Sequence, residues 1–334
     1  MVDEVLLLRE PDIRRLLDPR VCLSAIEAAF AAYSTGRADL PAVIQLNVPE
    51  RQGEIHVKAG HLHGGPVFAV KIASGFPGNP ALGRPASGGL VIAFDAATGA
   101  PAALLLDNGY ITDLRTGLAG AVAARHLSRK DASIAAVIGS GAQARHQARA
   151  LLLVRDLREV RVFGRDAGRA AACVAELAAD AAFAGRCRVT RAETAEAAAR
   201  GADIVITATS SRTPVLRDAW IGPGVHVTAV GSDQADKQEL EPELVARADR
   251  LVADSRAQCL RIGEIHHAIA AGLIGADAID AELGELAAGL APGRRTDDEI
   301  TLADLTGVGV QDVAAAGVVL ARARADGAGE RIAL

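Results

Sequence analysis

The chain has 334 residues, of which half are hydrophobic and only 3% aromatic, and its formal net charge is −5 at pH 7. That length accommodates one large or two ordinary domains, and the acidic balance with few aromatic rings excludes a typical nucleic-acid-binding protein. No uninterrupted apolar run of about 18 residues predicts a membrane span, and the acidic N-terminus does not resemble a signal peptide. We therefore expect a cytoplasmic protein that binds neither nucleic acid nor membrane.

The first third of the chain predicts an α+β arrangement. Apolar residues at helical spacing predict one helix over residues 11–36. Short β-rich runs separated by glycine and proline follow, which is typical of a mostly antiparallel sheet. The predicted strands are Ala42–Val48, Gly53–Lys58, Val67–Ile72, Gly89–Phe94 and Ala102–Leu106. An alanine-rich helix is predicted from about Thr112 to Leu127.

Beyond this helix, strands and helices alternate. Strands without a polar face, alternating with helices, indicate a parallel sheet covered on both sides. The predicted strands are Ser133–Ile138, Glu159–Phe163, Cys187–Val189, Ile204–Ala208, Val225–Val230 and Leu251–Ala253, and the predicted helices are Ala142–Val154, Ala167–Ala179 and Glu193–Ala199. A last helix, Val310–Ala325, lies beyond this pattern and is expected to return to the first domain.

The predicted fold class is therefore α/β, with two domains. A doubly wound Rossmann domain is expected over residues 116–309, and an α+β domain over residues 1–115. The C-terminal segment, residues 310–334, is expected to join the α+β domain.

A glycine-rich turn follows the first strand of the alternating part. Gly139 permits a tight turn, Gly141 lets the backbone approach a pyrophosphate, and the helix that begins next supplies N–H donors. An ordinary βα turn is the alternative, but the strand–turn–helix context favours a dinucleotide. The expected cofactor-binding residues of the turn are Gly139, Ser140, Gly141, Ala142 and Gln143.

The end of the second strand bears on which dinucleotide binds. A carboxylate there would bind the ribose 2′-hydroxyl of NAD, whereas an arginine would accommodate the 2′-phosphate of NADP. Arg165 comes before Asp166 after this strand, so the sequence slightly favours NADP over NAD. Thr209 and Ser210 follow another strand and are expected to lie along the cofactor.

The lysines are scarce enough to be informative. Of 36 basic residues only four are lysines: Lys58, Lys71, Lys130 and Lys237. Lys71 lies in an apolar run, where a charged side chain is costly unless it is paired, although an edge strand would let it point to water. Lys130 has the simpler interpretation of a surface residue.

Five short stretches, taken together and in order, are more specific than any one of them. They are Lys71–Asn79, Leu114–Gly117, Gly139–Gln143, Ala229–Asp233 and Ile300–Gly307. This ordered set resembles the ornithine cyclodeaminase/mu-crystallin family. The resemblance implies a homodimer, with an N-terminal domain for substrate and dimerisation and a Rossmann domain for NAD or NADP.

The resemblance also implies which residues bind the substrate. Arg115 matches an arginine that binds the substrate α-carboxylate, for which a guanidinium is suited by its bidentate geometry. Lys71 matches a lysine that contacts and polarises the substrate. Lys237 matches a lysine near the active site, with a solvated helix residue as the alternative.

Further residues follow the predicted strands. Asp233 matches the catalytic aspartate, and its place past a strand end suits a carboxylate that exchanges a proton with a substrate amine or imine. Val230 and Gly231 precede it on the expected cofactor side. Thr306 and Gly307 match the closing segment near the nicotinamide, Thr306 as a substrate residue and Gly307 as a cofactor residue.

The sequence departs from the family pattern in the N-terminal domain. Ala42 stands where many members carry an arginine, and a Met-Pro pair near residues 58–59 is missing. His56 and Lys58 are present instead, and strand alternation places them on one face. We expect Lys58 to replace the lost arginine or to bind a different substrate group, which puts plain ornithine specificity in doubt.

Other polar clusters point to no site. His61, His63, His266 and His267 lack an acidic partner with fixed spacing, so no metal is predicted. The four scattered cysteines are expected to be reduced.

The predicted function is NAD(P)-dependent hydride transfer at the α-carbon of a small amino or imino acid. The resemblance implies a cyclodeaminase or a ketimine reductase. An amino-acid dehydrogenase, such as alanine dehydrogenase, and a non-enzymatic NADP-binding protein are the alternatives.

Overall fold

A computed structural model describes residues 4–333 of the chain. The chain divides into two compact units. Unit 1 runs up to Arg115 and resumes at Val308, and unit 2 is Thr116–Gly307. Among the described residues, no helix is long and apolar enough to cross a membrane.

Unit 1 is built on one mixed sheet. Its strands are β1 (Glu4–Arg9), β2 (Ala38–Asp39), β3 (Ile44–Val48), β4 (Gly53–Leu62), β5 (Val67–Gly75), β6 (Ser87–Asp95), β7 (Pro101–Leu106) and β18 (Glu330–Ala333). Their order is β18-β1-β7-β6-β5-β4-β2, and β3 also pairs with β4. Only the β1–β7 pair is parallel among these described strands, so the predicted mostly antiparallel sheet is confirmed. The terminal strands β1 and β18 were not predicted.

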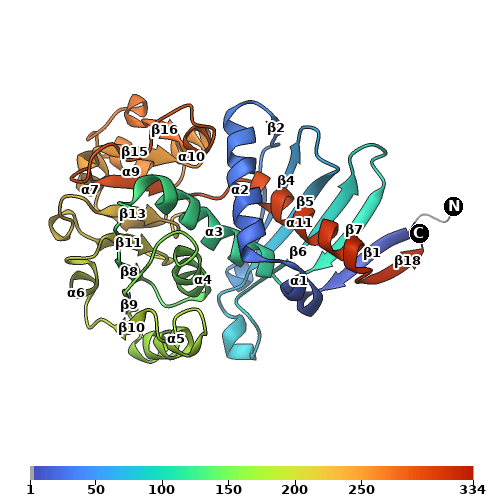
Figure 1. Ribbon diagram of the computed structural model, residues 1–334, viewed down its shortest axis with the longest axis horizontal. Coiled ribbons are helices and arrows are strands. Elements are labelled where there is room, and N and C mark those ends of the chain that lie inside the picture. The colour runs from blue at the N-terminus through green and yellow to red at the C-terminus, as the bar shows by residue number, and fades with distance from the viewer. Residues whose placement is uncertain (1–3, 334) are drawn as a thin grey trace. The chain divides into compact units, whose positions relative to one another are not determined.

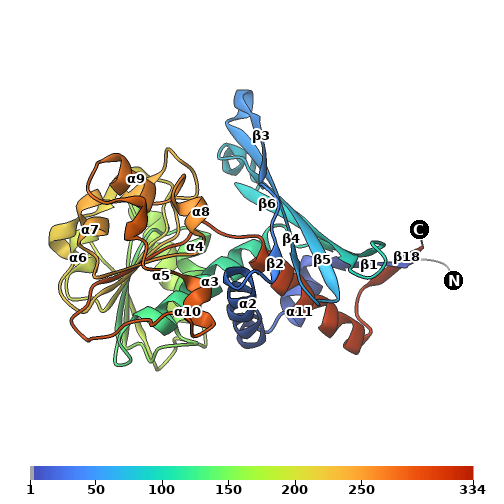
Figure 2. The same cartoon turned by 90° about the horizontal axis from the view of Figure 1, so that it is seen from above.

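Three helices of unit 1 lie on one face of this sheet, as Figure 2 shows: α1 (Glu10–Leu16), α2 (Pro19–Ser34) and α11 (Val310–Asp326). The single helix predicted over residues 11–36 is wrong, because the chain breaks between α1 and α2. The residue before a proline is disfavoured in the α conformation, and Asp18, before Pro19, is extended with φ −70° and ψ 119°. Its carboxylate accepts a hydrogen bond from the Arg20 amide and so starts a second helix.

The two faces of the unit 1 sheet differ in their covering. Alternate residues of β5 and β6, among them Val67, Ala69 and Val91, are buried on the side of α11. Phe68 and Phe94 point to the other side and stack with their ring centroids 5.0 Å apart. Strand alternation therefore gives this sheet a second apolar face that the unit 1 helices do not cover.

Unit 2 contains a parallel sheet with helices on both faces, which confirms the predicted Rossmann-type fold. Its strands are β8 (Ile134–Ile138), β9 (Glu159–Phe163), β10 (Arg188–Arg191), β11 (Ile204–Thr207), β13 (His226–Ala229), β15 (Arg250–Ala253), β16 (Ala281–Glu282) and β17 (Thr301–Asp304). Their order is β10-β9-β8-β11-β13-β17-β15-β16. A small separate sheet pairs β12 (Arg212–Leu216) with β14 (Gln238–Leu240). The strands β12, β14 and β16 were not predicted.

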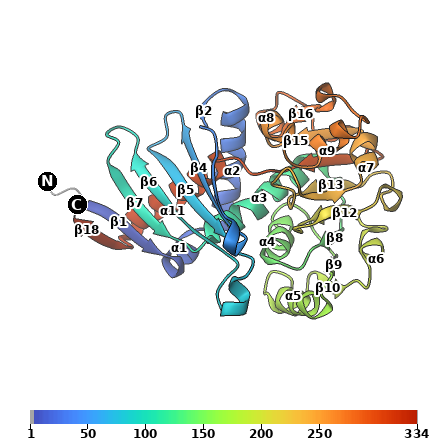
Figure 3. The same ribbon diagram turned by 180° about the vertical axis from the view of Figure 1, so that it is seen from behind.

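Figures 1 and 3 show α4 (Ala142–Leu151) and α5 (Ala167–Ala179) on one side of this sheet and α6 (Ala195–Ala199) and α7 (Pro242–Arg247) on the other. The short helices α8 (Arg256–Cys259), α9 (Ile265–Ala270) and α10 (Leu283–Ala287) complete unit 2. Helix α3 (Tyr110–Leu127) begins in unit 1 and ends in unit 2.

Candidate functional site

A buried group of charged residues lies where β5 and α3 meet the start of α11 in unit 1. We call Lys71, Arg115, Gln311 and Asp312 the Asp312 cluster. The Lys71 ammonium lies 2.9 Å from Asp312 Oδ2. Arg115 donates from Nε to Asp312 Oδ1 at 3.2 Å and from Nη1 to Gln311 Oε1 at 2.7 Å. No member of the cluster is more than 6% exposed.

The cluster shifts the ionisation of its members. Burial and the neighbouring Arg115 charge lower the pKa of Lys71 from its ordinary 10.5 to about 7. Burial acts to raise the pKa of Asp312, but Lys71 and Arg115 outweigh it and lower that pKa. Asp312 is therefore a carboxylate at neutral pH, whereas Lys71 exchanges its proton there.

Lys58 lies beside this cluster. It is the direct antiparallel partner of Lys71 in the β4–β5 pair, so the two side chains share the face that α11 covers. The Lys58 charge contributes to lowering the pKa of both Lys71 and Asp312. His56 follows on the same face of β4, where its Nε2 lies 3.3 Å from Glu54 Oε2.

Gln311 and Asp312 were not predicted from the sequence. They are two polar residues at the start of a helix that is otherwise rich in Ala and Val, and this irregularity was the available signal. Gln311 Nε2 is buried and has no hydrogen-bond partner among the described residues. A buried N–H group without an acceptor is costly, which suits a donor that serves a ligand.

The glycine turn of unit 2 has the geometry that its sequence predicts. Gly139 has φ 134°, and a Cβ there would collide with the carbonyl of Ala208. At Gly141 no atom lies within 4 Å of where a Cβ would be, so the turn leaves open space in front of α4. Arg145 holds the turn by donating to the carbonyl oxygens of Ser140 and Gly141. These features fit a dinucleotide pyrophosphate at the N-terminus of α4, with the N–H groups of Ala142 and Gln143 in the first turn of that helix.

The second and third residues after β9, Arg165 and Asp166, are exposed. Gly164 follows the strand directly, and a Cβ there would collide with the Ser140 side chain, so an acid at this position would require Ser140 to move. Asp166 caps α5 by accepting from the Arg169 amide at 2.9 Å. Arg165 follows Gly164 and is exposed.

The carboxyl ends of four strands of unit 2 lie side by side. Register pairs Thr207 with Ile138 and Ala229, and Ala229 with Asp304. The turns that follow these strands therefore meet at one edge of the sheet, where ligands of open α/β sheets bind. This edge brings together the predicted residues Gly139, Thr209, Ser210, Val230, Gly231, Thr306 and Gly307.

Two buried carboxylates hold this edge in place. Glu239 accepts four hydrogen bonds, from the Thr207 hydroxyl, the Thr209 amide and hydroxyl, and the Gly231 amide. Burial raises the pKa of Glu239.

Asp254 holds the turn after β17 in a similar way. It accepts from the Thr306 hydroxyl at 2.9 Å and from the Gly307 amide at 2.6 Å. The Thr306 hydroxyl therefore donates its hydrogen to Asp254, and its oxygen can only accept a hydrogen bond from a ligand.

Asp233 lies in the turn after β13 and is half exposed, with Lys237 as its ion-pair partner at 2.6 Å. Lys237 is not on a helix, because its amide donates to the Gln234 carbonyl within a turn before β14. The pair thus places a carboxylate and an ammonium together beyond the β13 strand end.

The remaining polar side chains divide into two groups. His266 and His267 donate to the backbone carbonyls of Gly263 and Lys237 and lie close to each other. His61 and His63, in contrast, lie beside Asp39, an acidic neighbour that linear spacing did not reveal. All four cysteines are free and buried.

Comparison with known proteins agrees with this architecture. Residues 3–327 match the sequence profile of the ornithine cyclodeaminase/mu-crystallin family. A proposed dehydrogenase of Rhizobium meliloti is 49% identical over 97% of this chain and 97% of its own. The structure of Thermococcus litoralis Delta(1)-pyrroline-2-carboxylate reductase with NADH and L-proline has a TM-score of 0.93 and 32% identity, covering 98% of this chain and 100% of that one. An archaeal alanine dehydrogenase dimer with bound NAD has a TM-score of 0.91 and 35% identity, covering 99% of each chain. The chain belongs to the ornithine cyclodeaminase/mu-crystallin family.

Proposed function

We propose that this protein is an enzyme that transfers hydride between NAD(H) and the α-carbon of a small amino or imino acid. The observation that carries the proposal is the Asp312 cluster, a buried set of cations whose positive charge exceeds its single carboxylate. A buried positive excess favours an anionic ligand, and a guanidinium is well matched to a carboxylate.

The residues of the cluster take different parts in this reaction. Arg115 and Lys58 bind the substrate α-carboxylate, with Lys58 compensating for the arginine absent at Ala42. Gln311 donates its free Nε2 hydrogen to the same carboxylate. Lys71 polarises the imine or amine in its protonated form, which its pKa of about 7 keeps populated near neutrality.

Asp233 takes the proton-transfer role. Its carboxylate lies beyond the β13 strand end on the cofactor side, and Lys237 holds it at 2.6 Å. In the reductive direction the imine carbon accepts a hydride and the imine nitrogen accepts a proton. NADH supplies the hydride when bound, and Asp233 relays the proton to the nitrogen.

Imine reduction and amino-acid oxidation are the same step in opposite directions, so one set of residues serves both. A cyclodeaminase would use the same site but return the hydride and release ammonia. The missing arginine at Ala42 argues against the ornithine-type version. A non-enzymatic NADP-binding protein would not require the buried Lys71–Asp312 pair, which is costly to maintain.

For the cofactor we propose NAD(H) rather than the NADP that the sequence slightly favours. Both solved relatives described above contain NADH or NAD. The absence of an acid directly after β9 does not by itself indicate NADP, because Gly164 at that position packs against Ser140. Arg165→Ala, measured against NADH and NADPH, tests the choice: it should leave KM for NADH nearly unchanged. A wild-type kcat/KM that is higher with NADPH, and lost in R165A, would restore NADP.

The function is tested by a substrate panel with purified protein and both cofactors, read as absorbance of the reduced nicotinamide. The panel contains cyclic imino acids, α-keto acids with ammonia, and the amino acids L-alanine, L-proline and L-ornithine. We expect net consumption of NADH with an imine and its formation with an amino acid. Ammonia release without net change of NADH would indicate a cyclodeaminase, and inactivity throughout would favour the binding protein.

We also propose a homodimer that buries the second apolar face of the unit 1 sheet. This face carries Phe68, Val70, Ile92 and Phe94 opposite the helices. Light scattering should give twice the chain mass, and Val70→Asp should give the monomer mass. Val21→Asp, an exposed position on α2 at the helix-covered side of the sheet, is the control and should remain dimeric. A monomeric wild type would refute the proposal.

A further inference from the structure

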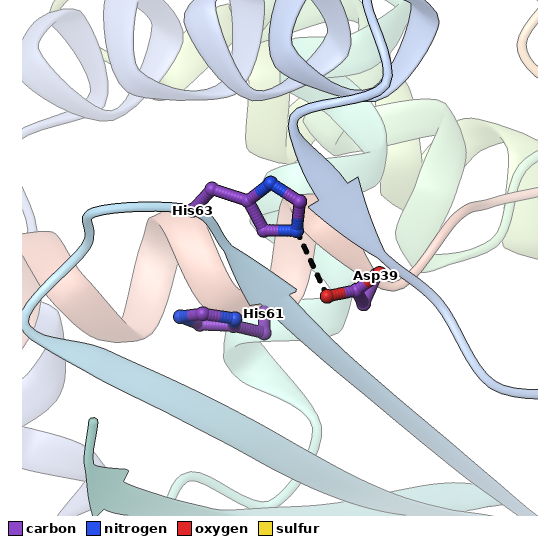
Figure 4. Close-up of side chains that lie close together, drawn as sticks. All are labelled: Asp39, His61 and His63. Carbon is purple, nitrogen blue, oxygen red and sulfur yellow. Dashed lines mark hydrogen bonds and ion pairs between the residues drawn. The ribbon is translucent and has the colours of Figure 1, made fainter. Parts of the chain in front are cut away.

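Three side chains with metal-binding atoms meet at the β2–β4 edge of unit 1. Figure 4 shows Asp39 on β2, His61 on β4 and His63 in the turn that follows. Asp39 and His61 are direct partners in the antiparallel pair. The ligand atoms of the three side chains all lie within 4.8 Å of one another.

The backbone prearranges this group. His61 and His63 stand two positions apart at the end of β4, and their ring centroids are 5.6 Å apart. The His63 amide donates to the Arg37 carbonyl at 3.0 Å, which fixes the turn beside β2. Two of the three ligands therefore come from one strand end and the third from its neighbour.

The spacing is close to what one ion requires. His63 Nε2 lies 2.8 Å from Asp39 Oδ2. Two donors bound to one ion at about 2.0–2.1 Å are separated by roughly 2.9–3.4 Å. This pair already has nearly that separation, and rotation of the His61 side chain, which is only partly buried, would bring its ring nitrogen closer.

We propose that Asp39, His61 and His63 bind one divalent transition-metal ion, with Zn²⁺ as the reference ion. Two imidazoles and one carboxylate suit zinc, nickel or copper better than magnesium or calcium, which prefer oxygen ligands. Because Asp39 and His63 are exposed, water completes the coordination shell. The alternative is that His63 and Asp39 form a simple ion pair with no metal. That alternative does not account for His61, which lies directly opposite Asp39 in the β2–β4 pair.

Such an ion would fasten β2 to the end of β4. These two strands are separated along the chain by the β3 hairpin, so binding would close that segment and stabilise the folded state. The site uses no residue of the Asp312 cluster, and its existence does not depend on the proposed reaction.

The proposal is tested by isothermal titration of ZnCl₂ into full-length, tag-free protein that has been stripped with a chelator and dialysed. One ion should bind per chain, and the Tm should rise with Zn²⁺ and not with Mg²⁺. The double variant H61Q/H63Q should lose both effects, and D39N should weaken binding at least about tenfold.

His126→Gln is the matched control, because His126 lies in α3, outside the group, and this variant should bind Zn²⁺ like the wild type. Equal Zn²⁺ affinity in H61Q/H63Q and wild type, or no binding by wild type, would overturn the proposal. Retention of binding in H61Q alone would show a His63–Asp39 ion pair that recruits metal without His61, which also contradicts the three-ligand site.

Discussion

The ammonium of Lys71 and the carboxylate of Asp312 lie 2.9 Å apart, both almost fully buried, although 241 residues separate them in the chain. The contact joins the middle of β5 to the first turn of α11. Arg115 binds the same carboxylate, so two cations share one counter-charge. Removing Asp312 would therefore leave two buried cations without an anion, whereas an added substrate carboxylate would supply a second one.

Asp312→Asn should destabilise the fold and weaken substrate binding. The substitution keeps the size of the side chain but removes the charge that holds Lys71 and Arg115, so the free energy of unfolding should fall by about 3–5 kcal/mol. Urea unfolding measures this loss, and steady-state kinetics should show a raised KM for the amino or imino acid.

The matched control is Asp326→Asn near the end of the same helix. Asp326 forms an exposed i, i+4 pair with Arg322, and such pairs contribute about 0.3–0.5 kcal/mol. Equal stability losses in the two variants would show that the buried pair has no special weight.

The Lys71 proton predicts a pH dependence of activity. Its pKa is about 7 in the folded protein, and the protonated form polarises the imine, so kcat/KM for reduction should fall as pH rises through about 7. Lys71→Arg should remove this inflection, because arginine stays charged. An unchanged profile in K71R would assign the inflection to another group.

The same shift has a consequence for stability. The folded pKa of Lys71 lies below its ordinary 10.5, so between pH 7 and 10.5 the unfolded chain binds the additional proton. The free energy of unfolding should therefore rise with pH across this interval. Below it Lys71 is protonated in both states and should contribute nothing to the pH dependence of that free energy. Comparison of wild type with Lys71→Met by unfolding at several pH values measures the slope, which should be smaller in the variant.

The sequence predicted what depends on local pattern. The Gly139–Gln143 turn and the strand–helix alternation depend on neighbouring residues, and the scarcity of lysine drew attention to Lys71. Asp312 could not be found in this way, because its role comes from a contact across 241 residues. Asp39 was missed for the same reason, since only the β2–β4 register places it beside His61. The break at Pro19 was a local signal that helical periodicity concealed.

Lys58→Met should raise KM for every substrate by about ten- to a hundredfold, because a charged hydrogen bond to the α-carboxylate is lost. Lys58 pairs with Lys71 across the β4–β5 ladder, so it lies near the group that all amino and imino acids share. Measurement over substrates with neutral and acidic side chains distinguishes this role from the alternative. Loss confined to dicarboxylic substrates would mean that Lys58 binds a second acidic group instead.

Lys130→Met provides the control for the Lys58 variant. Lys130 is exposed in a turn before β8, and removing its charge should change no kinetic constant. A similar loss in this variant would show that the effect comes from net charge and not from position.

Glu239→Gln should weaken binding of the nicotinamide cofactor. The carboxylate accepts from two amides and two hydroxyls, and it ties the turn after β11 to the turn after β13. A glutamine places an N–H₂ group against the amide of Thr209 or Gly231, so at least one of these donors loses its acceptor, at a cost of about 1–3 kcal/mol. Fluorescence titration with NADH should show a raised Kd, and urea unfolding should show a lower free energy of unfolding.

The control is Glu243→Gln, on the exposed side of α7, which should change neither the Kd nor the free energy of unfolding. If E239Q loses stability but keeps the wild-type Kd for NADH, Glu239 supports the fold without positioning the cofactor edge. The two roles can be separated because Thr209 and Gly231 lie at that edge, whereas Thr207 lies within the sheet.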